Sequence, residues 1–343
     1  MNAFKLALMN QTPIMKQITV RAPINIAVIK YWGKSNEELM LPCNDSISMT
    51  LESSNLYTET TVIADPNLEA DEFLLNGHPE IGLNKRITAT IKEAKRLAEQ
   101  IKDNEDILKC KLKIYSINTV PTASGLASSA SGIAALVFAL IKLYNLDRSF
   151  PLSVLSGIAR LGSGSACRSL FGGLVHWKGE IVEKIDDWPE LNGYVLVLNS
   201  GKKKISSTEG MQNTVNTSTL FQHRINSVVP ERINQILDAI KTRDFEKFAE
   251  LSMKDSNSFH ACCLDTFPPI SYLNSESFEV ISAVHEFNNE IGRVAVGYTF
   301  DAGPNAVIFG LQNDSGAFLQ KYPKWASSAI HWTLGAGPTV KEI

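Results

Sequence analysis

The sequence predicts an α+β protein built from two packed domains with a cleft between them. Strand and helix signals alternate through the first half of the 343-residue chain, whereas the second half is mainly helical. The change follows the turn Asp186-Asp187-Trp188-Pro189. With 44% hydrophobic residues, a chain of this length can bury two cores. We therefore expect a leader over 1–16, an N-terminal domain over 17–190 and a C-terminal domain over 191–343.

The strands and helices of the first half are indicated by residue type and spacing. β-Branched residues are concentrated at 18–29 and 57–63, and polar and apolar residues alternate at 111–116, so each segment is expected to be a strand. Asn76-Gly77 is typical of a hairpin turn. Apolar residues spaced by three and four predict an amphipathic helix over 84–103. Two more helices are expected, at 133–141 and, starting after Pro151, at 152–161.

The second half is expected to hold several helices flanked by short strands. A strand is predicted at 194–198, and two more at 294–299 and 305–309 are joined by Asp301-Ala302-Gly303-Pro304. Helical stretches between them are predicted at 219–228, 231–242, 245–259 and 275–288.

Composition excludes several classes of function. A net charge of −3 without a basic stripe argues against a nucleic-acid partner. The longest apolar run, Ile133–Ile141, is too short to span a membrane, and Leu6–Met9 is too short for a secretory signal. The five cysteines and six histidines show no disulfide or zinc-ligand spacing. We expect a soluble intracellular protein.

The most informative segment is residues 121–132, Pro-Thr-Ala-Ser-Gly-Leu-Ala-Ser-Ser-Ala-Ser-Gly, which leads directly into an apolar helix. Small residues allow the backbone to approach a ligand, and the unpaired amides that begin a helix attract phosphate. The hydroxyls of Ser128, Ser129 and Ser131 can add contacts to phosphate oxygens or to magnesium. The loop lacks the Gly-Lys-Ser/Thr ending of the Walker motif. The alternative is a capping loop with no ligand.

Three further segments place polar side chains at expected turns. The first is Ala-Pro-Ile-Asn-Ile-Ala-Val-Ile-Lys-Tyr-Trp-Gly-Lys at 22–34, an apolar strand that delivers Lys30, Tyr31 and Lys34 at its end. The others are Gly-Ser-Gly-Ser-Ala-Cys-Arg-Ser at 162–169 and Thr-Phe-Asp-Ala-Gly-Pro-Asn-Ala at 299–306. Arg168 can grip a carboxylate or phosphate through two parallel hydrogen bonds, and Asp301 lies in a turn that holds a carboxylate rigidly. Read singly, they are equally a strand end, a Gly/Ser turn and an Asp-initiated turn. Together they indicate one site.

These segments carry a family resemblance. The loop Pro-x3-Gly-Leu-Ala-Ser-Ser resembles that of the galactokinase, homoserine kinase, mevalonate kinase and phosphomevalonate kinase (GHMP) superfamily. The other three segments, with the runs 253–260 and 264–274, are similar to the eukaryotic-type mevalonate diphosphate decarboxylases within it. The match covers about 18–309. The chain differs at Asn118-Thr119-Val120, where Asn-Asn-Phe is expected, and at Ser124, where alanine is usual.

The resemblance implies a GHMP-kinase-like fold with the active site between a ribosomal S5 domain 2-like N-terminal domain, which binds nucleotide, and a ferredoxin-like C-terminal domain. It implies ATP-dependent conversion of mevalonate 5-diphosphate to isopentenyl diphosphate in isoprenoid biosynthesis, by a cytoplasmic homodimer using ATP and Mg²⁺. It assigns catalysis to Asp301, Lys30 and Arg168. Substrate binding falls to Tyr31, Lys34, Ser163, Ser165, Arg168 and Ala302. ATP binding falls to Asn118, Pro121, Ser124, Gly125, Leu126, Ala127, Ser128, Ser129 and Ser131, with Ser129 the candidate contact to magnesium on the ATP phosphates.

Three alternatives stay open at this stage. They are a small-molecule kinase of the same fold, a mevalonate 5-phosphate decarboxylase, and a catalytically silent nucleotide sensor. The run Asp255-Ser256-Asn257 through His260 lies within the resemblance, but we expect it to be structural and leave it outside the catalytic set.

Overall fold

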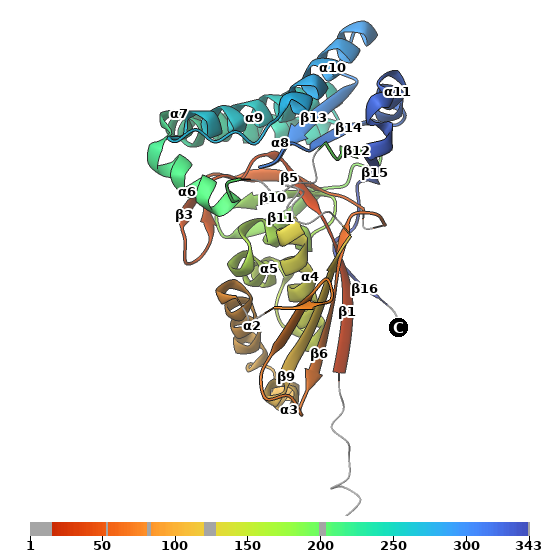
Figure 1. The fold of residues 1–343 in the computed structure, drawn as a ribbon. Helices are drawn as coiled ribbons and strands as arrows, with labels where there is room; N and C mark the ends of the chain where they lie inside the picture. The colour runs from red at the N-terminus through yellow and green to blue at the C-terminus, as the bar shows by residue number, and fades with distance from the viewer. Residues whose placement is uncertain (1–15, 53, 81–83, 120–127, 199–203, 342–343) are drawn as a thin grey trace, which may run out of the picture.

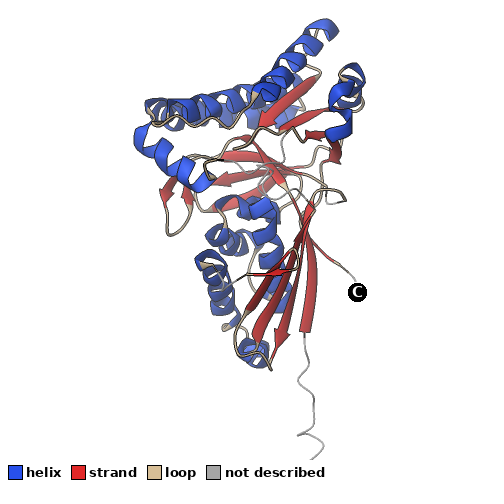
Figure 2. Cartoon of the chain, viewed as in Figure 1, coloured by secondary structure: helices blue, strands red, loops and turns tan. Residues whose placement is uncertain are grey.

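The computed structural model describes residues 16–52, 54–80, 84–119, 128–198 and 204–341. Figure 1 shows a lower part made mainly from the first half of the chain and an upper part made mainly from the second half. Strands and helices are mixed in both parts, as Figure 2 shows by colour, so the predicted α+β class and two-domain architecture are confirmed. Within these residues, every helix is too short or too polar to span a membrane.

The lower part is built on a six-stranded sheet. In spatial order its strands are β16 (Thr339–Val340), β1 (Lys16–Pro23), β6 (Tyr57–Asp65), β9 (Lys111–Asn118), β7 (Glu72–Leu75) and β8 (His78–Pro79). Buried and half-buried residues alternate along β6 because one face of the sheet lies on the core. The predicted hairpin between β7 and β8 is confirmed, with positive φ at both Asn76 (51°) and Gly77 (81°).

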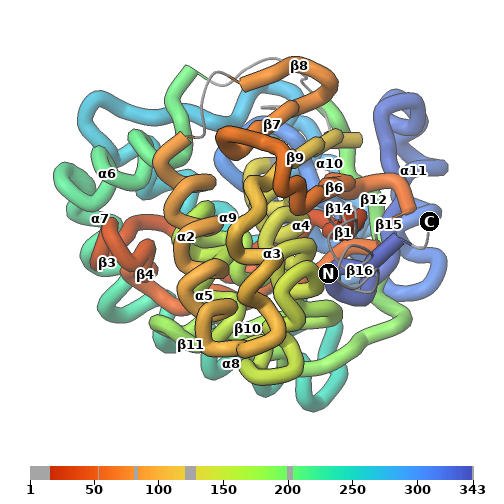
Figure 3. The backbone as a smooth tube through the Cα atoms, turned by 90° about the horizontal axis from the view of Figure 1, so that it is seen from below, coloured from red at the N-terminus to blue at the C-terminus, as the bar shows by residue number. Residues whose placement is uncertain are grey.

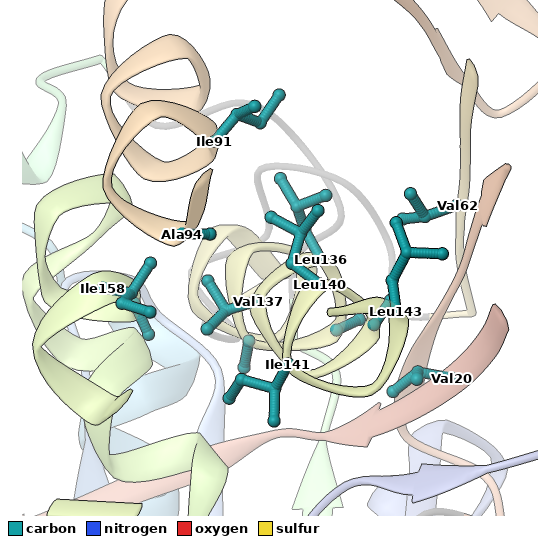
Figure 4. Packing of buried hydrophobic residues seen from close by; sticks show 14 of the residues in the cluster. Val20, Val62, Ile91, Ala94, Leu136, Val137, Leu140, Ile141, Leu143 and Ile158 are labelled. Carbon is teal, nitrogen blue, oxygen red and sulfur yellow. The ribbon is translucent and has the colours of Figure 1, made fainter. Parts of the chain in front are cut away.

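Helices cover one face of this sheet. They are α2 (Lys85–Ala98), α3 (Glu105–Lys109), α4 (Ser128–Leu143) and α5 (Leu152–Gly162). Figure 4 shows α4 at the centre, with Leu136, Val137, Leu140 and Ile141 between strand residues on one side and α2 and α5 on the other. Because α4 is buried on nearly every side, its sequence is apolar without a polar stripe.

The helix predicted over 84–103 begins where expected but ends earlier. The side chain of Asn84 caps it by accepting hydrogen bonds from the amides of Arg86 and Ile87. At the other end, buried Asn104 donates through Nδ2 to the carbonyl oxygens of Ala98 and Tyr144. This contact turns the chain into a short 3-10 segment, Lys102–Asn104, instead of continuing the helix.

A second sheet lies between the lower and upper parts. Its order is β11 (Ile181–Asp186), β10 (Leu174–Lys178), β5 (Ser46–Thr50) and β2 (Asn25–Ile29). All residues of β2 and β5 are buried, because both faces of this sheet are covered. A 3-10 segment, Gly164–Leu170, contacts it from below, and the hairpin of β3 (Lys34–Asn36) and β4 (Leu41–Pro42) follows β2.

The upper part is an antiparallel sheet with helices. The sheet has the order β13 (Val296–Phe300), β14 (Ala306–Leu311), β12 (Leu191–Leu196) and β15 (Ala329–Thr333). The helices are α6 (Ser207–Thr217), α7 (Thr219–His223), α8 (Val229–Thr242), α9 (Phe245–Asp265), α10 (Ser275–Ile291) and α11 (Asp314–Lys321). A π-helical turn, Arg224–Val228, joins α7 to α8. The predicted helices and strands of this half are present with shifted ends, whereas α6, α11, β15 and β16 were not predicted.

One hydrophobic core crosses from the second sheet into the upper part. Ile26, Val28 and Met49 of the sheet belong to the same buried cluster as Phe248 of α9 and Phe309 of β14. The last strand adds a backbone connection, because β16 returns to pair with β1, placing Val340 opposite Val20 (Figure 3). The two parts are therefore packed as one unit.

This shared core predicts a single cooperative unfolding transition. Phe248→Ala removes a fully buried ring from it and should lower the free energy of unfolding by about 3–5 kcal/mol. Urea unfolding followed by circular dichroism and tryptophan fluorescence checks both points. Phe267→Ala, at a ring that is 78% exposed, serves as the control and should leave stability unchanged within about 0.5 kcal/mol. Two separate transitions in the wild-type protein would contradict the shared core.

Candidate active site

The centre of the site is an ion pair between Lys30 and Asp301. Lys30 directly follows β2, and Asp301 directly follows β13, so each domain supplies one partner. Lys30 Nζ lies 2.5 Å from Asp301 Oδ1 and also donates to the carbonyl oxygen of Ala27 at 2.7 Å. Lys30 is only 2% exposed, whereas the Asp301 side chain retains 26% exposure. Burial lowers the pKa of Lys30, and the negative charges of Asp301 and Asp255 oppose that shift.

The backbone of Lys30 is held by a second, fully buried ionic group. Its N–H donates to Asp255 Oδ2 at 2.7 Å, and Asn44 Nδ2 donates to its carbonyl oxygen at 3.0 Å. Arg224 grips both oxygens of Asp255 at 2.9 and 2.8 Å, and Arg232 donates to Oδ1 at 3.0 Å. Burial raises the pKa of Asp255, but Arg224, the N–H of Lys30 and Arg232 together outweigh burial and leave that pKa below its usual value. Asp255 is therefore an ionised anchor for the end of β2.

Asp301 is held from the same helix. Ser256, the neighbour of Asp255 on α9, accepts a hydrogen bond at its Oγ from the N–H of Phe300 at 3.0 Å. Thr299 Oγ1 donates to the carbonyl oxygen of Ala27 at 3.3 Å. The segment that ends at Lys30 and the segment that ends at Asp301 are thus joined by the hydrogen bond between Thr299 and Ala27 as well as by the ion pair.

Arg168 is a buried cation near this pair. It is 4% exposed and lies in the 3-10 segment below the second sheet. Asn25 Oδ1 accepts from its Nε at 3.0 Å, and Ser46 Oγ accepts from its Nη1 at 2.9 Å. Burial lowers the pKa of Arg168, and the charge of Asp301 opposes this effect. These two bonds orient the guanidinium, and no described residue accepts a hydrogen bond from Nη2.

Tyr31 lies beside Arg168 with its hydroxyl buried. Its ring packs against Trp177 with centroids 4.6 Å apart, and within the described residues Oη has no hydrogen-bond partner. Burial raises the pKa of Tyr31, so the hydroxyl remains a donor at neutral pH. A Cβ at Gly164 would lie only 2.7 Å from this oxygen, so the 162–169 segment needs glycine there.

Two more cations, half-buried Lys34 and exposed Arg86, lie near Tyr31 and complete a basic surface. Burial and the charge of Arg86 both lower the pKa of Lys34, which shows that the two cations share one neighbourhood. Arg86, at the start of α2, donates to Thr208 Oγ1 at 3.0 Å. Together with Lys30 and Arg168, they give this region an excess of positive charge suited to a polyanion.

A pocket of about 270 Å³ opens next to this surface, between the six-stranded sheet and helices α2, α4 and α5. Arg86, Asn118, Ser129, Gly132 and Ser163 supply polar groups and backbone to its lining, and apolar side chains supply much of the rest. The start of α4 faces it, as expected for a phosphate site.

The remaining predicted residues are placed less uniformly. Ser131 is fully buried, and its Oγ pairs with Thr58 Oγ1 at 2.7 Å, beneath the pocket. Ser128 begins α4, Ser165 is half-buried in the 3-10 segment, and Ala302 is buried with Trp32. Pro121, Ser124, Gly125, Leu126 and Ala127 lie outside the described residues.

Comparison with known families agrees with this geometry. Residues 22–184 match the model of the diphosphomevalonate decarboxylase-like N-terminal domain, and residues 194–338 match that of the mevalonate 5-diphosphate decarboxylase C-terminal domain. The chain belongs to the diphosphomevalonate decarboxylase family. The resemblance of the sequence motifs is thereby confirmed.

Individual relatives of this family are similar over nearly the whole chain. The diphosphomevalonate decarboxylase of Schizosaccharomyces pombe is 49% identical over 94% of this chain and 85% of its own length. The human diphosphomevalonate decarboxylase is 47% identical over 88% of this chain and 78% of its own. A crystal structure of a mevalonate 5-diphosphate decarboxylase has a TM-score of 0.86 at 40% identity, covering 95% of this chain and 97% of that one.

One solved structure in this family also carries ligands. It is MDDEF in complex with MVAPP, AMPPCP and magnesium, 34% identical, with a TM-score of 0.78 over 96% of this chain and all of that one.

Sequence reasoning missed several residues that organise the site. Asp255 and Ser256 stood in a run that resembled the family, but we expected them to be only structural. Arg224 and Ser46 carried no signal, because each acts through a contact far along the chain. Asn25 stood in a run that resembled the family but was given no role, because its contact to Arg168 is equally distant in the chain. A charged residue such as Asp255 in a helical segment indicates a buried ion pair only when its partner can also be identified from the sequence.

His260 is a second buried titratable group near Lys30. It is 6% exposed, and its Nε2 has no hydrogen-bond partner among the described residues. Burial, followed by the positive charge of Lys30, lowers the pKa of His260 to about 3. The ring is therefore neutral at physiological pH.

This buried histidine predicts a loss of stability in mild acid. Below about pH 6.5 the unfolded chain takes up a proton that the folded protein refuses until about pH 3, so stability is full above that window and falls within it. This group contributes roughly 1.4 kcal/mol per pH unit. His260→Phe should lose that component of the slope in urea unfolding measured between about pH 7.5 and about pH 5. His78→Gln, at an exposed histidine, is the control, and an unchanged slope in His260→Phe would contradict the assignment.

Proposed function

We propose that this chain catalyses ATP-dependent decarboxylation of mevalonate 5-diphosphate to isopentenyl diphosphate, releasing ADP, phosphate and carbon dioxide. Family membership supports the reaction class. The observation that carries the proposal is the Lys30–Asp301 ion pair, with buried Arg168 beside it. This arrangement provides a base, a charge-stabilising cation and an anion-binding cation at the meeting point of the two domains.

The first step is phosphorylation of the C3 hydroxyl, because a tertiary hydroxyl is a poor leaving group. Asp301 accepts the proton of this hydroxyl as its oxygen attacks the γ-phosphoryl group, a contribution typically worth about 10²–10⁴-fold in rate. Lys30 pairs with Asp301 and stabilises negative charge that develops on the transferring group. The partly exposed carboxylate of Asp301 allows contact with substrate, whereas Lys30 approaches from the protein interior.

The second step is loss of the C3 phosphate together with carbon dioxide. Departure of phosphate builds positive charge at C3, and electrons from the breaking bond to the carboxylate form the alkene. Arg168 binds the substrate carboxylate and aligns that bond. Its attachment to Asn25 and Ser46 orients the guanidinium before substrate arrives.

The basic surface binds the diphosphate tail. Tyr31, Lys34, Ser163 and Ser165 donate to its oxygens, and Ala302 contacts the substrate. We add Arg86 to this set because its positive charge lowers the pKa of Lys34. The unpartnered hydroxyl of Tyr31 gains an acceptor when the tail binds.

ATP occupies the pocket at the start of α4. Residues 121–132 hold its phosphates, with Asn118 and Ser129 in the pocket lining, whereas Ser131 supports the loop from beneath. Magnesium, held by ATP phosphates with Ser129 as candidate ligand, supplies charge neutralisation of those phosphates. We further propose a cytoplasmic homodimer with a domain boundary near residue 190, on the basis of the family resemblance.

Coupled product release tests the reaction. Purified protein with ATP, Mg²⁺ and mevalonate 5-diphosphate should release ADP and carbon dioxide in equal amounts. Asp301→Asn should keep ATP binding, measured by calorimetry, but lower turnover by about 10²–10⁴-fold. Asp314→Asn, a carboxylate on α11 paired to Arg293, is the control. ADP release without carbon dioxide would make the protein a kinase, and a preference for mevalonate 5-phosphate would change the substrate.

Arg168→Lys should be poorly tolerated although it preserves charge. A lysine cannot bond Asn25, Ser46 and a carboxylate together, because the planar fork is lost. We expect the single-turnover rate of carbon dioxide release to fall by about 10²-fold, with little change in ATP affinity. Arg243→Lys, at a surface arginine, is the control. Near-normal decarboxylation in Arg168→Lys would exclude the carboxylate-binding role.

A further inference from the structure

Helix α9 contacts the two segments that carry the reacting pair through two adjacent residues. Asp255 accepts from the N–H of Lys30 at 2.7 Å, and Ser256 accepts from the N–H of Phe300, the residue before Asp301, at 3.0 Å. Both side chains are fully buried. One segment follows β2 and the other ends β13, so these two bonds join both domains to a single rigid element.

Each bond acts on backbone immediately beside a reacting side chain. Asp255 bonds the amide of Lys30 itself, and Arg224 and Arg232 hold that carboxylate in turn. Ser256 bonds the amide that precedes Asp301 in the chain. Because the two residues are neighbours on a helix, the separation of their side chains hardly varies. The positions of the two segments relative to each other are therefore determined by α9.

We propose that Asp255 and Ser256 are positioning residues, which set the geometry of Lys30 against Asp301 without touching substrate. This inference rests on the proposed function for its kinetic effect. A misplacement of about 1 Å in such a pair can lower the rate by about 10²-fold. The attraction between the two charges does not by itself fix the orientation of the Lys30 and Asp301 side chains.

Ser252 provides a matched control. It lies one turn earlier on α9, is also fully buried, and donates its hydroxyl to the carbonyl oxygen of Phe248 at 2.7 Å. This hydrogen bond involves neither segment of the site. Ser252→Ala and Ser256→Ala therefore remove the same atom from the same helix, and only Ser256→Ala frees the amide of Phe300.

The decisive experiment compares these variants in single-turnover kinetics. Ser256→Ala should lower the rate of carbon dioxide release by about 10- to 100-fold with KM for both substrates within about twofold, whereas Ser252→Ala should retain the wild-type rate. In an Asp301→Asn background, Ser256→Ala should have no further effect, because it acts through Asp301. Equal losses in the two serine variants, or additive losses in the double variant, would overturn the proposal.

A structural readout separates this inference from the proposed reaction. Crystal structures should show Lys30 Nζ and Asp301 Oδ1 moved beyond hydrogen-bond distance in Ser256→Ala but not in Ser252→Ala. An undisturbed pair in Ser256→Ala would overturn the inference even if the wild-type protein releases carbon dioxide. A displaced pair would support it even if the reaction proved to be a different one. Asp255→Asn should show the same displacement at Lys30, and if that variant fails to fold, the serine series decides.

Discussion

The Lys30–Asp301 ion pair constrains how the two domains are placed relative to each other. A lysine with 2% exposure has lost most of its hydration, and one carboxylate at 2.5 Å only partly compensates for that loss. The carbonyl oxygen of Ala27 accepts a second hydrogen bond from the ammonium group of Lys30. The negative charge of Asp255 also favours the protonated form of Lys30. Because the two partners come from different domains, satisfying this lysine requires both domains to hold one arrangement.

The ionic group around Asp255 holds the backbone of Lys30 in the same way that Asp301 holds its side chain. Two arginines, Arg224 and Arg232, pair with the single carboxylate of Asp255, so this group as a whole carries a net positive charge. The negative charge of Asp255 therefore does not cancel the positive charge of the site. Arg224 begins the π-helical turn between α7 and α8, a local irregularity that places its guanidinium against α9. Removing Asp255 would leave the buried guanidinium of Arg224 without its carboxylate, so this position should tolerate little change.

Sequence analysis singled out the polar residues at turns but not most of the residues that hold them in place. Lys30, Arg168 and Asp301 lie at turns in motifs with a chemical reading, and the structure brings them into one neighbourhood. The early end of α2 was not predictable, because it depends on Asn104 reaching Tyr144 across the fold. Ser256 looked like any helical serine, because its partner is the amide of Phe300 from a distant strand. A local sequence pattern predicts helices, strands and turns, whereas these two contacts join residues that only the tertiary fold brings together.

The pairing of β16 with β1 bears on how the protein is made. During synthesis on the ribosome, one edge of β1 can pair with β6 as soon as β6 has been translated, whereas the other edge stays open. That open edge receives its partner only when Thr339 and Val340 have been translated. Unpaired strand edges are templates for association with other chains. This edge of β1 therefore stays open between the synthesis of β6 and that of β16, which then pairs with Val20 and Arg21.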